Sequence, residues 1–130
     1  MKVVRYLNDQ NKAQFGAQHE DGSVTRIEGC IFSDHHDTGE TASVNKLLAP
    51  VKPAAVLCIG LNYRKHAEEG GADIPENPVL FMKMPSTVQN PGDPILLPTK
   101  LKSESVDYEC ELAVVIGKDC KNVSKADALD

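Results

Sequence analysis

The feature that most constrains the fold is a series of short strand-like segments separated by turn signals, with no long amphipathic helix. Short runs rich in Val, Ile, Thr and aromatic residues, bounded by Gly, Pro, Asn and Asp, are typical of β structure. The segments predicted to be strands are residues 3–7, 13–18, 23–29, 54–60, 79–83 and 106–116. The pattern therefore predicts an α+β fold that is rich in β structure.

The connections between these segments carry their own signals. Glu20–Gly22 ("EDG") predicts a hairpin turn, and the polar stretch 33–41 ("SDHHDTGET") predicts a turn-rich connection. Residues 61–71 ("LNYRKHAEEGG") allow one or two helical turns, which the two glycines would end. Ser124 with Asp127 three residues later resembles a helix N-cap with an acidic partner.

The length of 130 residues allows one domain, or one small domain and part of another. A proline-rich stretch that contains Pro50 and Pro53 follows the first group of strands. We place a domain boundary there, which divides the chain into a small N-terminal β domain (1–52) and a second unit (53–130). The run 54–60 is continuously apolar, so we expect that strand to be buried.

Composition excludes several classes of function. The formal net charge of −5 argues against a general nucleic-acid binder, which needs a basic face. No apolar run reaches the roughly 18–20 residues that cross a bilayer, and the first residues do not resemble a secretory signal. No two cysteines have C-x-x-C spacing, which argues against a zinc ribbon. Three of the four lie in or beside apolar stretches, where a free cysteine packs as a small hydrophobic residue, so we expect a reducing compartment. The four cysteines are Cys30, Cys58, Cys110 and Cys120.

Two glutamates stand one residue apart in the predicted strand 106–116. On a strand, Glu109 and Glu111 would share a face, with Cα atoms about 6.5–7 Å apart. Like charges at this separation repel, and a hard divalent cation with oxygen ligands removes that cost. Taken alone, the pattern is more often a half-exposed acidic face, so both interpretations stay open at this point.

A second pair of ionisable residues lies in the predicted helical turns. His66 and Glu69 are three residues apart, which places them on one helix face. A carboxylate can stabilise a protonated imidazole and make it a general base, although a solvated surface pair is the commoner case. Lys83 ends the apolar run 79–83, where it either extends to solvent or supplies positive charge at a pocket. The sequence "DHHD" (34–37) contains four residues whose side chains can bind a metal, but side chains of adjacent residues seldom converge on one ion.

Four stretches resemble, in their order and spacing, the fumarylacetoacetate hydrolase family. They are "LCIGLNYRKHAEE" (57–69), "ENPVLFMKMPST" (76–87), "PGDPILLP" (91–98) and "VDYECELAVVIGK" (106–118). The family pattern is a strand followed by G-x-N-Y-x-x-H-x-x-E, then P-x-x-F-x-K, then D-Y-E-x-E-L. Residues 3–53 are similar to the small N-terminal domain of many members, so the resemblance covers nearly the whole chain.

The resemblance implies a mixed β-roll of the fumarylacetoacetate hydrolase type, preceded by a small N-terminal β domain. Residues 53–130 would form the first part of the catalytic domain. Members are usually much longer than this chain. In the family, three carboxylates bind the metal, and the third is an aspartate in a later N-D-x-x-x-R-D block, which this sequence lacks. We therefore expect an incomplete catalytic domain whose remainder is lost or is carried by a separate chain.

The resemblance also implies roles for five residues. Glu109 and Glu111 are similar to two ligands of Mg²⁺ or Mn²⁺, with Ca²⁺ as a further alternative. His66 and Glu69 are similar to the family dyad that activates water or moves a proton. Lys83 is similar to a family lysine near the substrate, where it would favour developing negative charge.

The expected function is a divalent-metal-dependent hydrolase that cleaves a C–C bond in acylpyruvate-like β-diketo acids through a metal-bound enolate. Alternatives on the same scaffold are an oxaloacetate decarboxylase and a 2-hydroxyhepta-2,4-diene-1,7-dioate isomerase. A non-catalytic fragment that needs the missing half is an alternative of another class. The expected partners are an α-keto or β-diketo acid substrate and a second copy in a homodimer, with neither nucleic acid nor membrane. The expected location is the cytoplasm, with the mitochondrion as the alternative.

Overall fold

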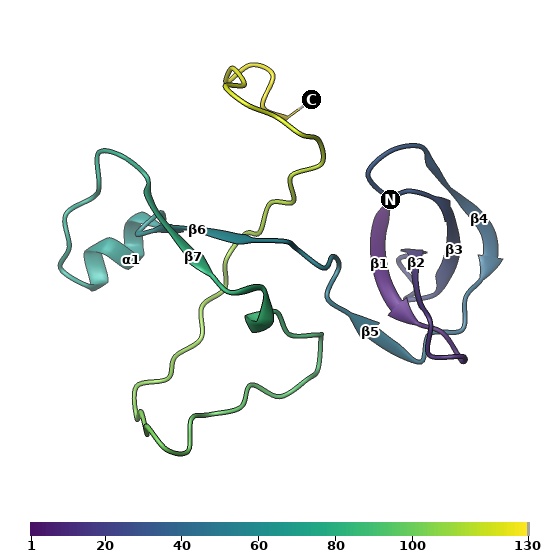
Figure 1. Ribbon diagram of the computed structural model, residues 1–130, viewed down its shortest axis with the longest axis horizontal. Helices are drawn as coiled ribbons and strands as arrows, with labels where there is room; N and C mark the ends of the chain where they lie inside the picture. Colours follow the sequence, from purple (N-terminus) through teal and green to yellow (C-terminus); the bar gives the residue numbers. More distant parts are fainter. Residues whose placement is uncertain (130) are drawn as a thin grey trace.

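The computed structural model describes residues 1–129. Strands account for 29% of the chain and helices for 7%, which confirms the prediction of a β-rich fold. The strands form two separate sheets, one of five strands and one of two (Figure 1). No helix in the described residues has the length and apolar character that crossing a membrane requires.

The first sheet is built from the N-terminal third of the chain. Its strands are β1 (Lys2–Leu7), β2 (Ala13–Gln18), β3 (Val24–Gly29), β4 (His35–Thr41) and β5 (Lys46–Leu48). The spatial order is β4-β3-β2-β1-β5, and all neighbours are antiparallel. The three strands predicted here all form, and the predicted hairpin turn at Gly22 has a positive φ of 85°.

Strand β4 corrects the sequence prediction, which gave residues 33–41 as turns. Its backbone pairs with β3 in the register Ile27↔Asp37 and Gly29↔His35, and the Thr38 hydroxyl donates a hydrogen bond to the Arg26 carbonyl oxygen. β4 is an edge strand, so its polar side chains can face water while its backbone completes the ladder. Pairing with β3 therefore outweighs the turn preference of the Asp, Thr and Gly residues.

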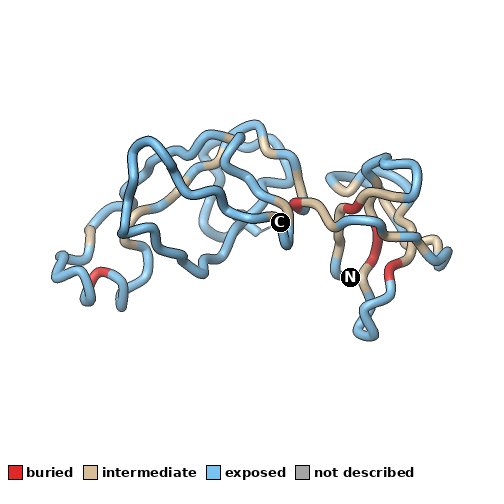
Figure 2. The backbone as a smooth tube through the Cα atoms, turned by 90° about the horizontal axis from the view of Figure 1, so that it is seen from below, coloured by how far each residue is buried: buried red, intermediate tan, exposed pale blue. Residues whose placement is uncertain are grey.

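A small core lies on the N-terminal sheet. Tyr6, Ala17, Val24 and Ala49 are buried, and Figure 2 shows most of the buried backbone at this end of the molecule. Burial raises the pKa of Tyr6, an effect that Arg26 partly opposes. Gly16 faces this core at close range, because an added Cβ would contact the Val24 side chain and lie 2.7 Å from the Thr25 carbonyl oxygen. The approach of β2 to β3 therefore requires glycine at this position.

The second sheet is a pair of antiparallel strands, β6 (Val56–Gly60) and β7 (Val79–Lys83). Helix α1 (Arg64–Glu69) follows β6 and is capped at Gly70, and the 3₁₀ helix η1 (Pro85–Thr87) follows β7. Both strands and the short helix that ends at the glycines confirm the sequence predictions.

The prediction that the strand at 54–60 is buried was wrong. Leu57 and Ile59 on β6 are 62% and 39% exposed, and every residue of β7 is exposed. Burial of a two-stranded sheet requires a second layer on at least one face. Within residues 1–129, no such layer packs on β6 and β7, so an apolar run alone does not make a buried strand.

The strand predicted at 106–116 does not form in the part of the chain that the structure describes, and its residues are exposed. A strand needs a neighbour for its backbone groups, and here the Leu112 N–H instead donates to the Tyr63 hydroxyl at 2.9 Å. Further along, the Ser124 hydroxyl donates to Asp127 at 2.6 Å, and the Asp127 N–H donates back to it. The predicted cap contact is present, but residues 125–129 form turns and not a helix.

Candidate functional site

A tight turn between β6 and α1 positions the first group of candidate residues. Leu61 in this turn has a φ of +51°, a left-handed conformation that is uncommon for leucine. Tyr63 is the N-cap of α1 with extended backbone, and His66 and Glu69 follow within the helix. The turn therefore directs the chain from the strand into the helix that carries both residues of the predicted dyad.

His66 lies beside one of the two glutamates predicted to bind a metal. Its Nδ1 is 3.6 Å from Glu109 Oε1, and the two side chains are 54% and 52% exposed. The residues come from different sequence blocks, which the structure brings together. Both side chains are half exposed, so solvent screens the interaction between them.

Tyr63 is a site residue that the sequence argument missed. Its hydroxyl accepts the hydrogen bond from the Leu112 N–H, which ties the segment 107–112 to the start of α1. This tie lies three residues from Glu109 and next to Glu111 in the sequence. The sequence could have indicated this residue, because Tyr63 is the tyrosine of the G-x-N-Y-x-x-H-x-x-E motif.

The other two residues predicted to be catalytic, Glu69 and Lys83, have no described ion pair with His66. Glu69 is on the same helix, yet among the described residues the carboxylate within ion-pair distance of His66 is that of Glu109. Lys83 ends β7 with its Nζ 5.9 Å from the centre of the Phe81 ring, which is a cation–π distance. The dyad and the substrate-facing lysine therefore stay predictions.

The donor chemistry of Glu109 and Glu111 fits a hard cation. Carboxylate oxygens are the ligands that Mg²⁺, Mn²⁺ and Ca²⁺ prefer. Across residues 1–129, however, no three His, Cys, Asp or Glu side chains are grouped so that they could hold a metal ion. Glu109 and Glu111 also lie outside any described strand, so the same-face geometry expected for them is not formed. Two donors of the right type are present, and further ligands would have to join them.

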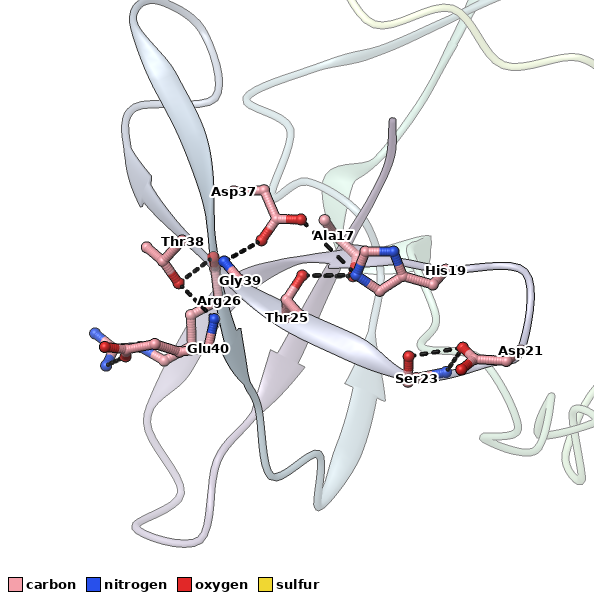
Figure 3. Close-up of polar contacts among 10 residues, drawn as sticks. All are labelled: Ala17, His19, Asp21, Ser23, Thr25, Arg26, Asp37, Thr38, Gly39 and Glu40. Atoms are coloured by element: carbon pink, nitrogen blue, oxygen red, sulfur yellow. Dashed lines mark hydrogen bonds and ion pairs between the residues drawn. The ribbon is translucent and has the colours of Figure 1, made fainter.

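Asp37, the last residue of the "DHHD" stretch, has structural contacts within the N-terminal sheet (Figure 3). A hydrogen bond from Thr25 and one from the Gly39 N–H hold the pKa of Asp37 below its usual range. His19 Nε2 lies 2.8 Å from Thr25 Oγ1 and 3.8 Å from Asp37, so this cluster links the β2–β3 turn to β4. The nearby Asp21 also has a lowered pKa, because it accepts hydrogen bonds from the Ser23 hydroxyl and N–H.

Comparison with protein families decides the identity of the second half of the chain. The family model described as "Fumarylacetoacetate (FAA) hydrolase C-terminal" matches residues 55–130, which is more than half of the sequence. The chain belongs to the fumarylacetoacetate hydrolase family. A second family model, described as "Rv2993c-like, N-terminal", matches residues 1–50 of this family member. The family predicted from the four sequence stretches is thereby confirmed.

Several curated proteins are similar to this fumarylacetoacetate hydrolase family chain. A Dictyostelium discoideum homolog of fumarylacetoacetate hydrolase domain-containing protein 2 is 49% identical over 84 residues, which are 65% of this chain and 27% of the relative. The Bacillus subtilis oxaloacetate tautomerase YisK is 52% identical over 89 residues, 65% of this chain and 29% of the relative. A mitochondrial oxaloacetate tautomerase of Xenopus laevis is 45% identical over 85 residues, which are 65% of this chain and 26% of the relative.

A solved structure supports the fold. A Mycobacterium abscessus protein of 32% sequence identity superposes with a TM-score of 0.60 over 77% of this chain and 40% of that one. The matched part amounts to between about a quarter and a third of the length of the curated relatives. The family and the β-rich fold are therefore shown for the part of the relatives that this chain spans.

Proposed function

We propose that this chain carries acid–base and metal-binding residues of an enzyme that forms an enolate from an α-keto acid, with keto–enol tautomerisation of oxaloacetate as its reaction. The observation that carries the proposal is the approach of His66 to Glu109, at 3.6 Å. Two relatives of about half identity over the matched residues bear the name oxaloacetate tautomerase, which supports this choice of reaction. The proposed division of the chain places all of these residues in the unit 53–130.

The chemistry needs a group that can take and return one proton. Histidine changes its charge near neutral pH, so the His66 imidazole can remove a proton from the carbon between the two carbonyl-bearing carbons of oxaloacetate. The same proton, or one exchanged with water, is then delivered to the keto oxygen, which gives the enol. Glu109 stabilises the imidazolium that exists between these two steps. No oxidant, nucleophile or leaving group is required.

A divalent cation would be held by Glu109 and Glu111. When bound, Mg²⁺ or Mn²⁺ supplies positive charge that stabilises a developing oxyanion. The ion pair with His66 uses Glu109 Oε1, so Oε2 of the same carboxylate is left for a cation. Lys83 pairs with Val56, at the end of the β6–β7 pair opposite to the end that leads into α1, so its role toward an anionic substrate rests on the family resemblance alone.

A second candidate is hydrolysis of a C–C bond in acylpyruvate-like β-diketo acids. It passes through a similar enolate but also needs a water made nucleophilic by a base. The observation in its favour is that Glu69 stands on α1 three residues from His66, a spacing at which two side chains can meet. Oxaloacetate decarboxylation and isomerisation of a hydroxy-diene dioate share the enolate step and are further alternatives.

Metal binding can be tested without measuring activity. Titration calorimetry with Mn²⁺ should show binding that weakens at least about tenfold in Glu109→Gln and in Glu111→Gln, because each loses a charged ligand. Glu104→Gln is the matched control, since Glu104 is an exposed glutamate on the same segment. Unchanged affinity in both site variants would contradict the assignment of these residues as ligands.

The proton-transfer role is tested with His66→Ala in the full protein that carries this sequence. Loss of a general base should lower kcat for enol–keto conversion of oxaloacetate by about 10²–10⁴, with Mn²⁺ affinity nearly unchanged. Enol absorbance in the ultraviolet follows the reaction. Full activity in His66→Ala would refute the acid–base role, and loss of metal binding would make His66 a ligand.

Glu69→Gln separates the two candidate reactions. If water must be activated, this variant lowers acylpyruvate cleavage, and the double variant with His66→Ala loses less than the sum of the two losses. Tautomerisation needs no activated water, so it should depend little on Glu69. A tautomerase rate that falls as far in Glu69→Gln as in His66→Ala would favour the dyad over the pair of His66 with Glu109.

A further inference from the structure

A cavity of about 310 Å³ lies where the chain leaves the N-terminal sheet and meets the segment after β7. One wall comes from β1 and residues 49–53, and the other comes from residues 85–90. The volume is at the lower end of the range for small-molecule sites, which is roughly 300–1,000 Å³. It shares no residue with the candidate site formed by His66 and the two glutamates.

The charged side chains of this cavity are both positive. They are Arg5 from β1 and Lys52 from the chain that follows β5, and no carboxylate lines the cavity. Among the ion pairs that join described residues, none includes either cation. The Arg5 guanidinium donates one long hydrogen bond, of 3.5 Å, to the Ala49 carbonyl oxygen, which leaves most of its N–H groups for a ligand.

The rest of the lining suits a small organic molecule better than a bare ion. Val51, Pro53, Pro85 and Val88 provide apolar surface. The Ser86 hydroxyl has no hydrogen-bond partner among residues 1–129 and can donate to an anion. A few polar groups on a mostly apolar wall are the usual composition of a ligand site.

Contacts between the two walls hold the cavity in shape. Asn90 Oδ1 accepts the Ala49 N–H at 3.0 Å, and its Nδ2 donates to Asp93 Oδ2 at 2.8 Å. Lys46 on β5 donates to Asp93 Oδ1 at 2.6 Å. Hydrogen bonds from Lys46 and Asn90 hold the pKa of Asp93 below its usual range, so it stays ionised near neutral pH. These contacts occupy Asn90 and Asp93 and leave Arg5, Lys52 and Ser86 to face the space.

We propose that this cavity binds a small organic carboxylate, with Arg5 and Lys52 holding the anionic group and the apolar wall holding its carbon chain. The planar guanidinium matches a carboxylate with two parallel N–H···O bonds, and the lysine adds a second positive charge. The chain as a whole has a net charge of −5, whereas the lining of this cavity contains two positive side chains and no carboxylate. The cavity is therefore a local site that attracts anions. The site is separate from the proposed metal-dependent chemistry.

The test is a titration of the 130-residue chain with succinate, followed by the backbone amide signals in two-dimensional nuclear magnetic resonance spectra. Saturable shifts are expected for Ala49, Lys52 and Ser86, with none for Thr25 on β3. Arg5→Gln should weaken succinate binding about tenfold or more, because a charge-assisted hydrogen-bond pair is lost. Lys52→Gln should weaken it less, and Lys2→Gln, a change to an exposed lysine on the same strand as Arg5, should leave it unchanged.

Inorganic phosphate, at equal ionic strength, distinguishes an organic carboxylate from any anion. Weaker binding of phosphate than of succinate supports the proposal, and equal binding overturns the choice of an organic ligand. Succinate affinity that is unchanged in both Arg5→Gln and Lys52→Gln, or shifts spread evenly over the chain, overturns the site itself. Lys52 is exposed, so Lys52→Gln keeps the test decisive if Arg5→Gln disturbs β1.

Discussion

The N-terminal sheet and the β6–β7 pair are both made of short strands, but the first has a buried core and the second is open to solvent. Four buried apolar residues, Tyr6, Ala17, Val24 and Ala49, belong to the first region, whereas Ala67 is the buried apolar residue described in the second. The contrast is visible in Figure 2 as buried backbone at one end and exposed backbone at the other.

The difference does not follow from how apolar the strands are. β7 reads "VLFMK" and every residue is exposed, while β1 reads "KVVRYL" and contains the fully buried Tyr6. A strand is buried when other strands or a second layer cover it, and β1 has neighbours on both edges, β2 and β5. Covering elements therefore decide burial, and the candidate site lies on the open region.

The largest expected effect comes from matched truncations of one aromatic residue in each region. Tyr6→Ala should lower the free energy of unfolding by about 3–5 kcal/mol, because it empties the core of the N-terminal sheet. Phe81→Ala should cost about 1 kcal/mol or less, because Phe81 is 44% exposed. Urea denaturation of both variants measures the two losses. Equal losses would mean that β7 is covered in solution as well as β1 is.

A smaller effect is expected from a matched pair of strand glycines. An added Cβ at Gly16 would meet the Val24 side chain and the Thr25 carbonyl, so Gly16→Ala should cost about 1–3 kcal/mol. At Gly60 the nearest heavy atom would be 3.5 Å away, an ordinary contact, so Gly60→Ala should be close to neutral. Thermal unfolding of the two variants, followed by circular dichroism, gives the comparison. A neutral Gly16→Ala would show that β2 and β3 can separate without cost.

The smallest effect concerns the contact between the N-terminal sheet and the segment after β7, in which Lys46 on β5 donates a hydrogen bond to Asp93. Asp93 also accepts a hydrogen bond from Asn90 of its own segment. These hydrogen bonds lower the pKa of Asp93. Its contribution to stability is therefore complete above the pKa of an unfolded aspartate and is lost as the pH falls through the lower folded value. Asp93→Asn should be slightly less stable than the parent protein at about pH 7, and the difference should shrink in acid, at a pH well below the range of an unfolded aspartate. Denaturation at both pH values checks this, and a difference that persists in acid would assign the effect to something other than the charge.

Much of the fold could be predicted from the sequence because the local sequence signals agree with the strand pairing in the structure. The strand predictions at 3–7, 13–18, 23–29 and 79–83 coincide closely with β1, β2, β3 and β7. The helix that ends at Gly70 was also predicted, from its length and the glycines that follow. Where the two disagreed the prediction failed: β4 is polar and forms because β3 offers its edge, whereas residues 106–116 find no strand to pair with in the described chain.

For the candidate site, the sequence supplied the residues but not all of their partners. His66, Glu69, Lys83, Glu109 and Glu111 were identified from motif spacing. The approach of His66 to Glu109 and the bond from Leu112 to Tyr63 join positions far apart in the chain, and no local pattern specifies such pairs.

The amino-acid sequence was sufficient to predict the family, the β-rich class and the positions of most short elements, because motif spacing and turn residues act over a few neighbouring residues. Contacts between distant parts of the chain specify which strands are buried, which polar stretch becomes a strand, and which carboxylate lies beside His66. Burial and pairing are properties of the surfaces that meet, and those surfaces are brought together only when distant parts of the chain pack.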